Sequence, residues 1–393
     1  MRLALVHDFL VQHGGAEEVL KVFHDVWPEA PIYTLVHDPK KLGSLFSSAD
    51  LSAGLSAKAL ASAEALAKAD VRPSFIQRMP FGKRKYQWFL PLMPTAIERH
   101  DLMGYDVVLS SSSAFAKGVI TSPETLHISY CHTPTRYLWT DTHRYMHERG
   151  TMPPLRLLMH PLLTVLRLWD RHAADRADYF IANSKNVQSR IQKYYRRNSD
   201  VIHPPVNTKN FQFPISNFQN NQSNYFLAGG RLVAYKRFDL IVRVFNRLGI
   251  PLKVFGTGPA CAALKKEAKP NIEFLGFVDQ GARAELYRHC TAFIHPQEED
   301  FGLTVIEAMA SGRPVIAYAK GGALETIKEG ETGILFHEQI WEALADAVLR
   351  FDATQFDPQK IRTHALQWDV EQFKTKIKQY VDDKWKQFQN SKL

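Results

Sequence analysis

Short apolar runs recur along the chain, and most are followed by a turn containing glycine or serine and then by an amphipathic segment. Runs of this length predict buried strands, and segments with apolar residues every three or four positions predict helices. The strand-forming runs lie at residues 2–7, 31–35, 105–112, 126–130, 179–182, 225–230, 252–259, 271–278, 292–295 and 315–318. Repeated strand, turn and helix units predict α/β domains with doubly wound parallel sheets.

The chain is predicted to form two such domains. Its 393 residues exceed what one hydrophobic core usually serves. The pattern restarts at Tyr225, after a stretch at residues 207–224 that is rich in Asn, Gln and Ser, and we place the interdomain linker there. The first domain is therefore expected to span residues 1–206 and the second residues 207–372.

Composition narrows the class of protein. Hydrophobic residues make up 45% and charged residues 23% of the chain, which is the balance of a soluble globular protein. The net charge of +9 favours an anionic partner, such as a nucleic acid, a membrane surface or a phosphorylated substrate. The 3 cysteines lack metal-ligand spacing, so we expect no zinc site, no disulfide framework and a reducing cytoplasm. Prolines and arginines interrupt the apolar stretch at residues 152–169, so it is not expected to be a membrane-spanning helix. The N-terminal apolar run is too short for a signal peptide.

One stretch, residues 296–314, carries the most chemistry. It is predicted to be a strand end, an acidic loop that turns at Phe301 and Gly302, and a helix that begins at Leu303. The first N–H groups of such a helix, here those of Gly302, Leu303 and Thr304, favour an anion. Glu299 precedes the helix and Glu307 lies inside it. A ligand with hydroxyls on both sides of a phosphate, such as a nucleotide sugar, fits this pattern, although acidic residues also occur near helix starts simply to complement the helix dipole.

Further candidates follow other predicted strands. Gly14 and Gly15 lie at a strand-to-helix turn that either approaches a phosphate or is an ordinary turn. Arg231 and Lys236 follow the first strand of the second domain, where they could neutralise a departing diphosphate or form a solvated basic turn. His132 comes at the carboxyl end of a strand, where open parallel sheets bind ligands, although a lone histidine is more often structural.

These motifs together resemble the retaining glycosyltransferases of family 4, whose two-domain fold is called GT-B. The resemblance rests on Glu299-x7-Glu307, on Arg231-x4-Lys236, on the first-loop residues Asp8, Gly14, Gly15, Ala16 and Glu17, and on the loop at residues 131–139. It covers nearly the whole chain and is weakest at residues 42–69. It implies two Rossmann-like domains facing a central cleft, with a C-terminal helix at residues 373–393 that packs back on the first domain.

The resemblance also implies roles for single residues. Glu299, His132, Arg231 and Lys236 are expected to be catalytic, and Asp8, Lys117 and Arg136 to lie on the acceptor side. The expected donor-binding residues are Gly14, Gly15, Gly256, Gly258, Phe301, Gly302, Leu303, Thr304 and Glu307. No Asp-x-Asp motif stands where a metal-dependent transferase needs one, so we expect neither a metal nor another cofactor.

The implied activity is transfer of a hexosyl unit from a nucleoside diphosphate sugar to a hydroxyl group. The resemblance is greatest to bacterial mannosyltransferases that use GDP-mannose in O-antigen or exopolysaccharide assembly, which implies a lipid-linked glycan acceptor. A UDP-sugar donor is an alternative. Two other classes stay open: a sugar-nucleotide epimerase of the same fold, and a sugar-nucleotide-binding protein without catalysis.

Basic and aromatic residues alternate at residues 72–94, with Arg72, Lys83 and Lys85 among the basic ones and Phe81 and Trp88 among the aromatic ones. This mixture suits an anionic membrane surface. Alternatively, the aromatic residues are core and the charges a solvated face. Nucleic-acid binding ranks last because no recognisable module is present. We therefore expect a cytoplasmic protein, peripheral on the inner face of the cytoplasmic membrane.

Overall fold

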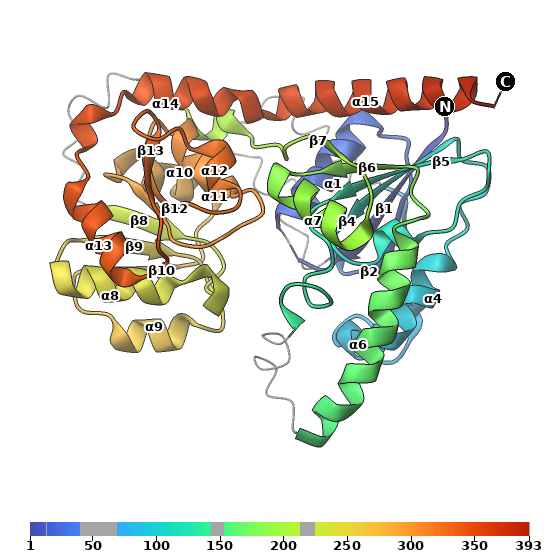
Figure 1. Ribbon diagram of the computed structural model, residues 1–393, viewed down its shortest axis with the longest axis horizontal. Helices are drawn as coiled ribbons and strands as arrows, with labels where there is room; N and C mark the ends of the chain where they lie inside the picture. Colours follow the sequence, from blue (N-terminus) through green and yellow to red (C-terminus); the bar gives the residue numbers. More distant parts are fainter. Residues whose placement is uncertain (13, 40–68, 143–152, 213–224, 393) are drawn as a thin grey trace. The chain divides into compact units, whose positions relative to one another are not determined.

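The computed structural model describes residues 1–12, 14–39, 69–142, 153–212 and 225–392 (Figure 1). The chain forms two compact units: unit 1 comprises Met1–His203 and Lys374–Leu393, and unit 2 comprises Pro204–Phe373. The division lies three residues before the predicted boundary after Val206, because Val206, Thr208 and Phe211 are buried in the core of unit 2. The Ala-rich segment at residues 57–69, whose composition favours a helix, lies outside the described residues except for its last position.

Unit 1 contains a seven-stranded sheet in which the described pairings are parallel and the strand order is β3-β2-β1-β4-β5-β6-β7. The strands are β1 (Leu3–Leu10), β2 (Ile32–His37), β3 (Val71–Pro73), β4 (Val107–Ser112), β5 (Leu126–Cys131), β6 (Tyr179–Ala182) and β7 (Asp200–Val201). The first strand continues three residues beyond the predicted end at His7, so Asp8 belongs to a strand and not to the following loop.

Helices cover both faces of this sheet (Figure 1). They are α1 (Gly15–Val26), α4 (Met93–Glu98), α6 (Pro153–Ala173), α7 (Lys185–Tyr195) and α15 (Val370–Asn390), with short 3-10 helices η2 (Phe75–Arg78), η3 (Tyr86–Leu92) and η4 (Ala116–Gly118). On one face of the sheet, Val6 and Val108 share a core with α4 and α6. On the other face, Phe23 of α1 packs edge-on against Tyr130 of β5. Ser184 caps α7 by accepting a hydrogen bond from the Val187 N–H at 3.1 Å.

Most of helix α15 belongs to unit 1. Lys374 lies 3.7 Å from Asp25 of α1, and the Tyr380 hydroxyl donates to Asp200 at 2.8 Å. Ile377 and Val381 are fully buried. Burial raises the pKa of Asp25, and Lys374 opposes that rise. The helix expected at residues 373–393 thus contributes both apolar and charged contacts to the first unit.

Unit 2 contains a six-stranded sheet of order β10-β9-β8-β11-β12-β13, again with parallel pairings among the described residues. Its strands are β8 (Phe226–Gly229), β9 (Leu252–Phe255), β10 (Ile272–Gly276), β11 (Phe293–His295), β12 (Val315–Tyr318) and β13 (Gly333–Phe336). Its helices are α8 (Phe238–Leu248), α9 (Cys261–Glu267), α10 (Gln280–His289), α11 (Leu303–Ala310), α12 (Ala323–Thr326), α13 (Trp341–Arg350) and α14 (Pro358–Ala365), together with the 3-10 helices η5 (Thr208–Phe211), η7 (Ala234–Lys236), η8 (Ala353–Gln355) and η9 (Leu366–Trp368).

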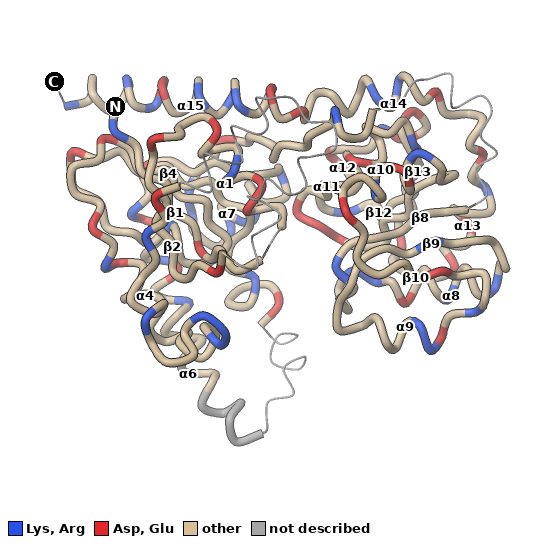
Figure 2. The backbone as a smooth tube through the Cα atoms, turned by 180° about the vertical axis from the view of Figure 1, so that it is seen from behind, with Lys and Arg blue, Asp and Glu red and all other residues tan. Residues whose placement is uncertain are grey.

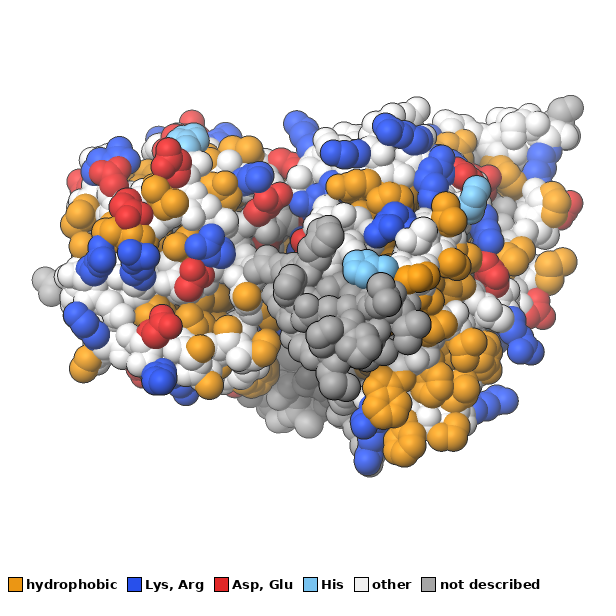
Figure 3. Space-filling view, turned by 60° about the horizontal axis from the view of Figure 1, so that its bottom comes forward, with side chains coloured by type: hydrophobic (Ala, Val, Ile, Leu, Met, Phe, Trp, Pro, Cys, Tyr) orange, Lys and Arg blue, Asp and Glu red, His pale blue; other side chains and the backbone are white. Residues whose placement is uncertain are grey.

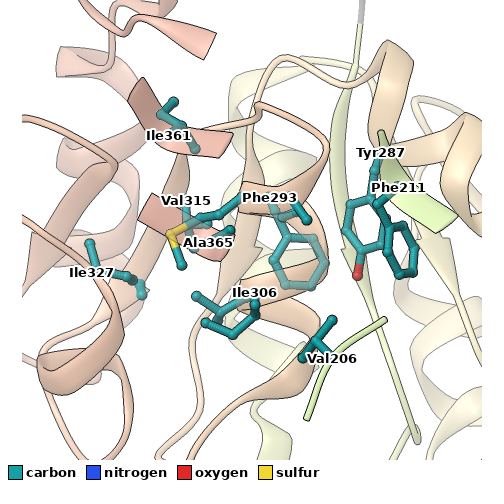
Figure 4. Packing of buried hydrophobic residues seen from close by; sticks show 14 of the residues in the cluster. Val206, Phe211, Tyr287, Phe293, Ile306, Val315, Ile327, Ile361 and Ala365 are labelled. Carbon is teal, nitrogen blue, oxygen red and sulfur yellow. The ribbon is translucent and has the colours of Figure 1, made fainter. Parts of the chain in front are cut away.

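Alternate residues of these strands enter two different cores. Phe293 and Val315 face Ile306 of α11, Ile361 of α14 and Tyr287 of α10 (Figure 4). The intervening positions, such as Phe226, Ile294 and Ile316, pack with α8, α9 and α13. Each sheet is therefore buried on both faces, which explains why its strands are continuous apolar runs and not alternating ones.

In both units the strand order reverses beside the first strand. Unit 1 has its reversal between β1 and β4, and unit 2 between β8 and β11. Open α/β sheets bind ligands at this switch point, beyond the carboxyl ends of the strands. The doubly wound topology predicted for both halves is confirmed, and the loops after β1, β4, β8 and β11 become the first places to look for a site.

Candidate functional site

The switch point of unit 2 brings together two loops that the sequence analysis selected separately. The turn after β8 carries Arg231 and Lys236, and the loop after β11 carries Glu299. Lys236 Nζ lies 2.7 Å from Glu299 Oε1, and both side chains are largely buried. A charged pair at this distance holds both loops at the strand ends. Arg231 is exposed on the same turn, and its side chain makes no hydrogen bond or ion pair with the described residues.

Helix α11 begins directly behind Glu299. Its N-cap residue, Gly302, has φ +93°, a conformation that glycine adopts without the strain of a side chain. The Thr304 hydroxyl is buried and finds no partner among the described residues. Phe301, in contrast, points into the core and packs edge-on against Trp368, and Leu303 packs against the same core. Phe301 and Leu303 can therefore serve a ligand through their backbone groups.

His295, which was not among the predicted site residues, lies beneath this helix start. A Cβ atom added at Gly302 would lie 3.6 Å from His295 Nε2. Gln297 Nε2 donates to His295 Nδ1 at 3.1 Å, so the ring carries its proton on Nε2. Burial lowers the pKa of His295 to about 4, which keeps the ring neutral near pH 7. The sequence signal that could have identified His295 was its position at the end of a buried strand.

Glu307 is held from the neighbouring helix α10. Arg283 Nη2 lies 3.1 Å from Glu307 Oε1, and the Tyr287 hydroxyl donates to Glu307 Oε2 at 3.2 Å. Burial, followed by the charge of Glu307, raises the pKa of Tyr287, so the phenol keeps the proton that it donates. Neither Arg283 nor Tyr287 could be selected from sequence, because each reaches Glu307 only through the packing of α10 on α11.

Two glycines allow the turn after β9 to pack closely against the turn after β8. Gly256 has φ +110°, and a Cβ atom there would lie 1.8 Å from the Gly230 carbonyl oxygen, while one at Gly258 would lie 2.2 Å from that of Leu232. The turn after β9 thus rests directly on the turn that carries Arg231. Gly256 and Gly258, predicted to bind the donor, have this bracing role in the structure.

Gly321 braces the acidic loop in the same way, which gives a test. Its φ is +62°, and an alanine Cβ there would lie 2.2 Å from the Glu299 carbonyl oxygen. Gly330 has φ +75° but has nothing within 4 Å of the same position. Both alanine variants must adopt the left-handed conformation, at a cost of about 1 kcal/mol. We expect Gly321→Ala to lower the free energy of unfolding by a further 1–3 kcal/mol or so, because backbone must move.

Urea unfolding of the two variants measures this difference. Equal losses for Gly321→Ala and Gly330→Ala would show that the contact with Glu299 adds nothing to the conformational cost.

In unit 1, Asp8 accepts five hydrogen bonds from the loop after β4. The backbone N–H groups of Ser113, Ala114, Phe115 and Ala116 donate to its two oxygens at 2.6–2.8 Å, and the Ser113 hydroxyl adds a fifth bond at 3.1 Å. Asp8 is 2% exposed. This corrects the acceptor-side expectation for Asp8, because its carboxylate is already occupied in shaping the loop.

Lys117 is also turned inward. Its ammonium donates to the Ala114 carbonyl oxygen and to Asp170 of α6, and both members of the ion pair are 1% exposed. Asp170 also accepts from Thr135 Oγ1 at 2.7 Å and from Trp139 Nε1 and the Tyr195 hydroxyl at 2.8 Å each. Lys117 is therefore a structural residue and not a free acceptor-side cation. The pair ties the loops after β4 and β5 to α6 and α7.

His132 lies at the carboxyl end of β5, as predicted, and is partly exposed. Its Nε2 atom lies 2.8 Å from Ser111 Oγ, which in turn lies 3.1 Å from His7 Nδ1. Burial, and then the nearby His7, lower the pKa of His132 to about 3, so the ring is neutral near pH 7. The predicted residue is thus connected to two buried side chains, those of Ser111 and His7.

The other predicted residues of unit 1 have simpler surroundings. Gly14 is the N-cap of α1 and Gly15 its first residue; a Cβ atom at Gly14 would lie 3.0 Å from Glu17 Oε2. Arg136 is half-buried, and its carbonyl oxygen accepts from the N–H groups of residues 139–141. Among the described residues, no group of three or more His, Cys, Asp or Glu side chains could hold a metal ion.

The segment at residues 72–94 contains both kinds of surface that the sequence left open. Ile76, Leu90 and Met93 are buried in the core of unit 1. Phe81 and Trp88 are 64% and 65% exposed, with Lys85 Nζ 4.1 Å from the Trp88 ring centre. Basic positions lie close together on the tube beside α4 in Figure 2, and Figure 3 shows exposed hydrophobic and basic side chains next to one another on the face that it draws. No helix in the described ranges has both the length and the apolar character needed to cross a bilayer.

Comparison with known proteins places this architecture. The crystal structure of Anabaena Alr3699/HepE in complex with UDP superposes with a TM-score of 0.68 at 16% identity, covering 98% of this chain and all of that one. This likeness, together with two doubly wound sheets, defines the GT-B fold and confirms the predicted fold class. Residues 56–210 match the family Glycosyltransferase Family 4, and residues 210–368 match Glycosyl transferases group 1. Over residues 56–368, the chain is thus similar to glycosyltransferases.

Curated relatives agree with this placement. The alpha-1,3/1,6-mannosyltransferase ALG2 of Dictyostelium discoideum is 24% identical over 284 residues, which cover 61% of this chain and 64% of that protein. The GDP-mannose-dependent alpha-mannosyltransferase of Corynebacterium glutamicum is 35% identical over 107 residues, 27% of this chain and 26% of that protein. The chain thus spans less than two thirds of the length of these relatives.

Proposed function

We propose that this protein is a retaining glycosyltransferase that moves a hexosyl unit from a nucleoside diphosphate sugar to a hydroxyl of a lipid-linked glycan in surface polysaccharide synthesis. The observation that carries the proposal is the Lys236–Glu299 pair at the switch point of unit 2, directly before the amino end of α11. Cation, carboxylate and unpaired backbone N–H groups at one strand edge match the phosphate and the hydroxyls of such a donor.

Each residue has a distinct part in this proposal. Lys236, Arg231 and the first turn of α11 stabilise the diphosphate, on which negative charge grows as the donor breaks. Glu299 accepts hydrogen bonds from the sugar hydroxyls and Glu307 from the ribose. His132 of unit 1 contacts the transferred sugar. Two carboxylates that hold opposite ends of one donor need not act as an acid and base pair.

The proposed step breaks the bond between the anomeric carbon and the phosphate oxygen and forms a bond from that carbon to the acceptor oxygen on the same face. The bond electrons leave with the diphosphate, and the acceptor proton moves to a phosphate oxygen. No protein nucleophile is required, so catalysis comes from orientation and from stabilisation of the leaving group. We propose that the protein does this without a metal ion.

GDP-mannose is the favoured donor because the Corynebacterium glutamicum relative, 35% identical over 107 residues, is named for its dependence on GDP-mannose. The second candidate is a UDP-sugar, since structurally similar chains were solved in complex with UDP and with UDP-glucose. The two candidates share the phosphate site and differ in the base and the sugar.

Thermal unfolding with a panel of GDP-, UDP- and ADP-sugars distinguishes these donors. A bound donor at a hundred times its dissociation constant stabilises the native state by about 2.7 kcal/mol, so one nucleotide class should raise the Tm of the native protein. Glu307→Ala should abolish most of this shift, because its loss removes the proposed ribose contact. Glu285→Ala on the exposed face of α10 is the control, since Glu285 faces solvent beside Arg288 and His289 of the same helix.

No Tm shift with any nucleotide sugar would count heavily against the proposal. An unchanged shift in Glu307→Ala would remove Glu307 from the site, and conversion of the donor without any acceptor would indicate an epimerase.

We also propose that unit 1 binds the anionic inner face of the cytoplasmic membrane through Phe81, Trp88 and the basic residues between them. Exposed aromatic rings insert shallowly while lysine and arginine attract anionic headgroups. Lys83, Arg84 and Lys85 are all exposed on this segment. A membrane-bound acceptor would then be reached without diffusion through solvent.

Sedimentation with vesicles tests this surface. We expect binding to vesicles containing phosphatidylglycerol, weakened several-fold by Phe81→Ser with Trp88→Ser, and lost at high salt because headgroup attraction is screened. Phe277→Ser removes an exposed aromatic ring of unit 2 and should leave binding unchanged. Equal binding to uncharged vesicles, or an effect of Phe277→Ser as large as that of the double variant, would contradict the assignment.

A further inference from the structure

Four polar side chains of unit 1 form one line from helix α1 to the loop after β5. Glu17 Oε1 lies 3.9 Å from His7 Nε2, His7 Nδ1 lies 3.1 Å from Ser111 Oγ, and Ser111 Oγ lies 2.8 Å from His132 Nε2. Glu17, His7 and Ser111 are at most 4% exposed, whereas His132 is partly exposed. The line therefore connects a buried carboxylate with a partly exposed ring.

The middle of this line permits two arrangements of protons. A serine hydroxyl has one proton, and a neutral imidazole has one donor nitrogen and one acceptor nitrogen. If Ser111 donates to His7, it accepts from His132 Nε2–H. If Ser111 donates to His132, it accepts from His7 Nδ1–H. The tautomers of the two histidines are thus coupled through a single hydroxyl.

Glu17 selects between these arrangements. It lies in the first turn of α1, where the helix dipole complements a negative charge, and a carboxylate is only a hydrogen-bond acceptor. At 3.9 Å its influence on His7 is electrostatic, since this distance exceeds a hydrogen bond. The charge favours an N–H group over a lone pair at His7 Nε2. His7 Nδ1 then accepts from Ser111, and Ser111 accepts from His132 Nε2–H.

We infer that Glu17 is a positioning residue that acts through His7 and Ser111 to hold His132 as its Nε2–H tautomer, which leaves His132 Nδ1 as a hydrogen-bond acceptor for a hydroxyl of the transferred sugar. Among the described residues, nothing donates to His132 Nδ1. The contact with a sugar rests on the proposed function, but the control of the tautomer by Glu17 does not.

Nitrogen NMR of the unliganded protein with ¹⁵N-labelled histidine reports the tautomer directly. The spectra are recorded at mildly alkaline pH, where ordinary histidines are neutral, and the His132 signals are identified by their absence in His132→Gln. We expect the native ring to carry its proton on Nε2. Glu17→Gln is isosteric but removes the charge, so the population should move toward the Nδ1–H form.

Two further variants isolate the path. Glu18→Gln removes a charge from the next position of the same helix turn and should leave the His132 signals unchanged. Ser111→Ala breaks the line, so Glu17→Gln should have no additional effect on His132 in that background, as a double-mutant cycle measures. The Tm of each variant shows whether it keeps the native fold. If Glu17→Gln has a lower Tm than the native protein, the Tm of Glu18→Gln shows whether losing a charge from this helix turn is the cause.

Three results would overturn the inference. They are a native His132 with its proton on Nδ1, a Glu17→Gln spectrum identical to the native one, and an equal response to Glu17→Gln with or without the Ser111 hydroxyl.

Steady-state kinetics of Glu17→Gln tests the contact between His132 and the sugar. Loss of one hydrogen bond in the transition state should lower kcat/KM of Glu17→Gln roughly tenfold. A shifted tautomer with unchanged kcat/KM would refute the contact between His132 Nδ1 and the sugar. A native protein without transferase activity would refute the proposed function, while the NMR result would still decide the role of Glu17.

Discussion

Replacing Lys236 by methionine is expected to lower kcat/KM for sugar transfer by about 10²- to 10³-fold, because one preorganised charge is removed from the leaving diphosphate. Methionine keeps most of the aliphatic stem, so packing is largely retained. The Lys236 side chain is only 12% exposed, and solvent therefore replaces the lost charge poorly. Steady-state kinetics with the donor identified by the thermal panel gives the measurement.

Lys320 provides the matched control for this variant. It pairs with Glu298 at 3.2 Å, beside the same acidic loop, but its side chain is 56% exposed. An exposed pair contributes about 0–1 kcal/mol, so Lys320→Met should change kcat/KM by only a few-fold. If Lys236→Met and Lys320→Met have similar effects, the positive charge at the switch point has no special place in the chemistry.

Lys117→Met is expected to lower the free energy of unfolding by about 3–5 kcal/mol, because Asp170 would keep a buried charge without its cationic partner. Both side chains of this pair are 1% exposed. Thr135, Trp139 and Tyr195 still donate to Asp170, but neutral donors compensate for a buried charge only in part. Urea unfolding followed by tryptophan fluorescence measures the loss.

Arg171→Met is the control for this second variant. Arg171 pairs with Asp175 at 2.7 Å on the surface of the same helix, with side chains 32% and 49% exposed. Its loss should change the free energy of unfolding by about 0.5 kcal/mol or less. A loss below about 1 kcal/mol for Lys117→Met would mean that Asp170 is solvated or protonated in the variant, against the burial on which the expectation rests.

Much of the fold could be predicted because its signals are local. Most buried strands contain an apolar run, although β4 ends in three serines, and the helix cap at Ser184 and the glycine at Gly302 are set by neighbours a few residues away. Periodicity therefore located most of the strands, whereas β3, β7 and β13 were not predicted. The acidic loop was found before its surroundings were known. The end of β1 was missed because Asp8 is polar, although the strand continues through it.

The partners of the candidate residues could not be predicted, since they are distant in sequence. Lys117 and Asp170 are 53 positions apart, and Asp8 meets its loop 105 to 108 positions later. A lysine beside glycine and an aspartate after a strand fit an open site as well as a buried network. Only the packing of β1, β4 and α6 separates these possibilities.

The segment at residues 72–94 shows a different limit of sequence reasoning. It consists of short 3-10 helices, with a non-helical residue at Phe89 and Pro91 within η3, so no single period orders its side chains. Ile76 is consequently buried and Phe81 exposed, although both are large and apolar. The core alternative therefore holds for Ile76, while the exposure of Phe81 leaves membrane binding as a proposal.

The division of the chain bears on the order in which it folds during synthesis. Unit 2 is continuous from Pro204 to Phe373, whereas unit 1 lacks part of its core until Lys374–Leu393 has been made. The backbone of Val206 forms hydrogen bonds with that of Trp368 and Val370, so the first and last segments of unit 2 are joined to each other. Domains generally fold as units while the ribosome proceeds. Unit 2 can therefore reach its native state while the first-made part of the chain still waits for its final helix.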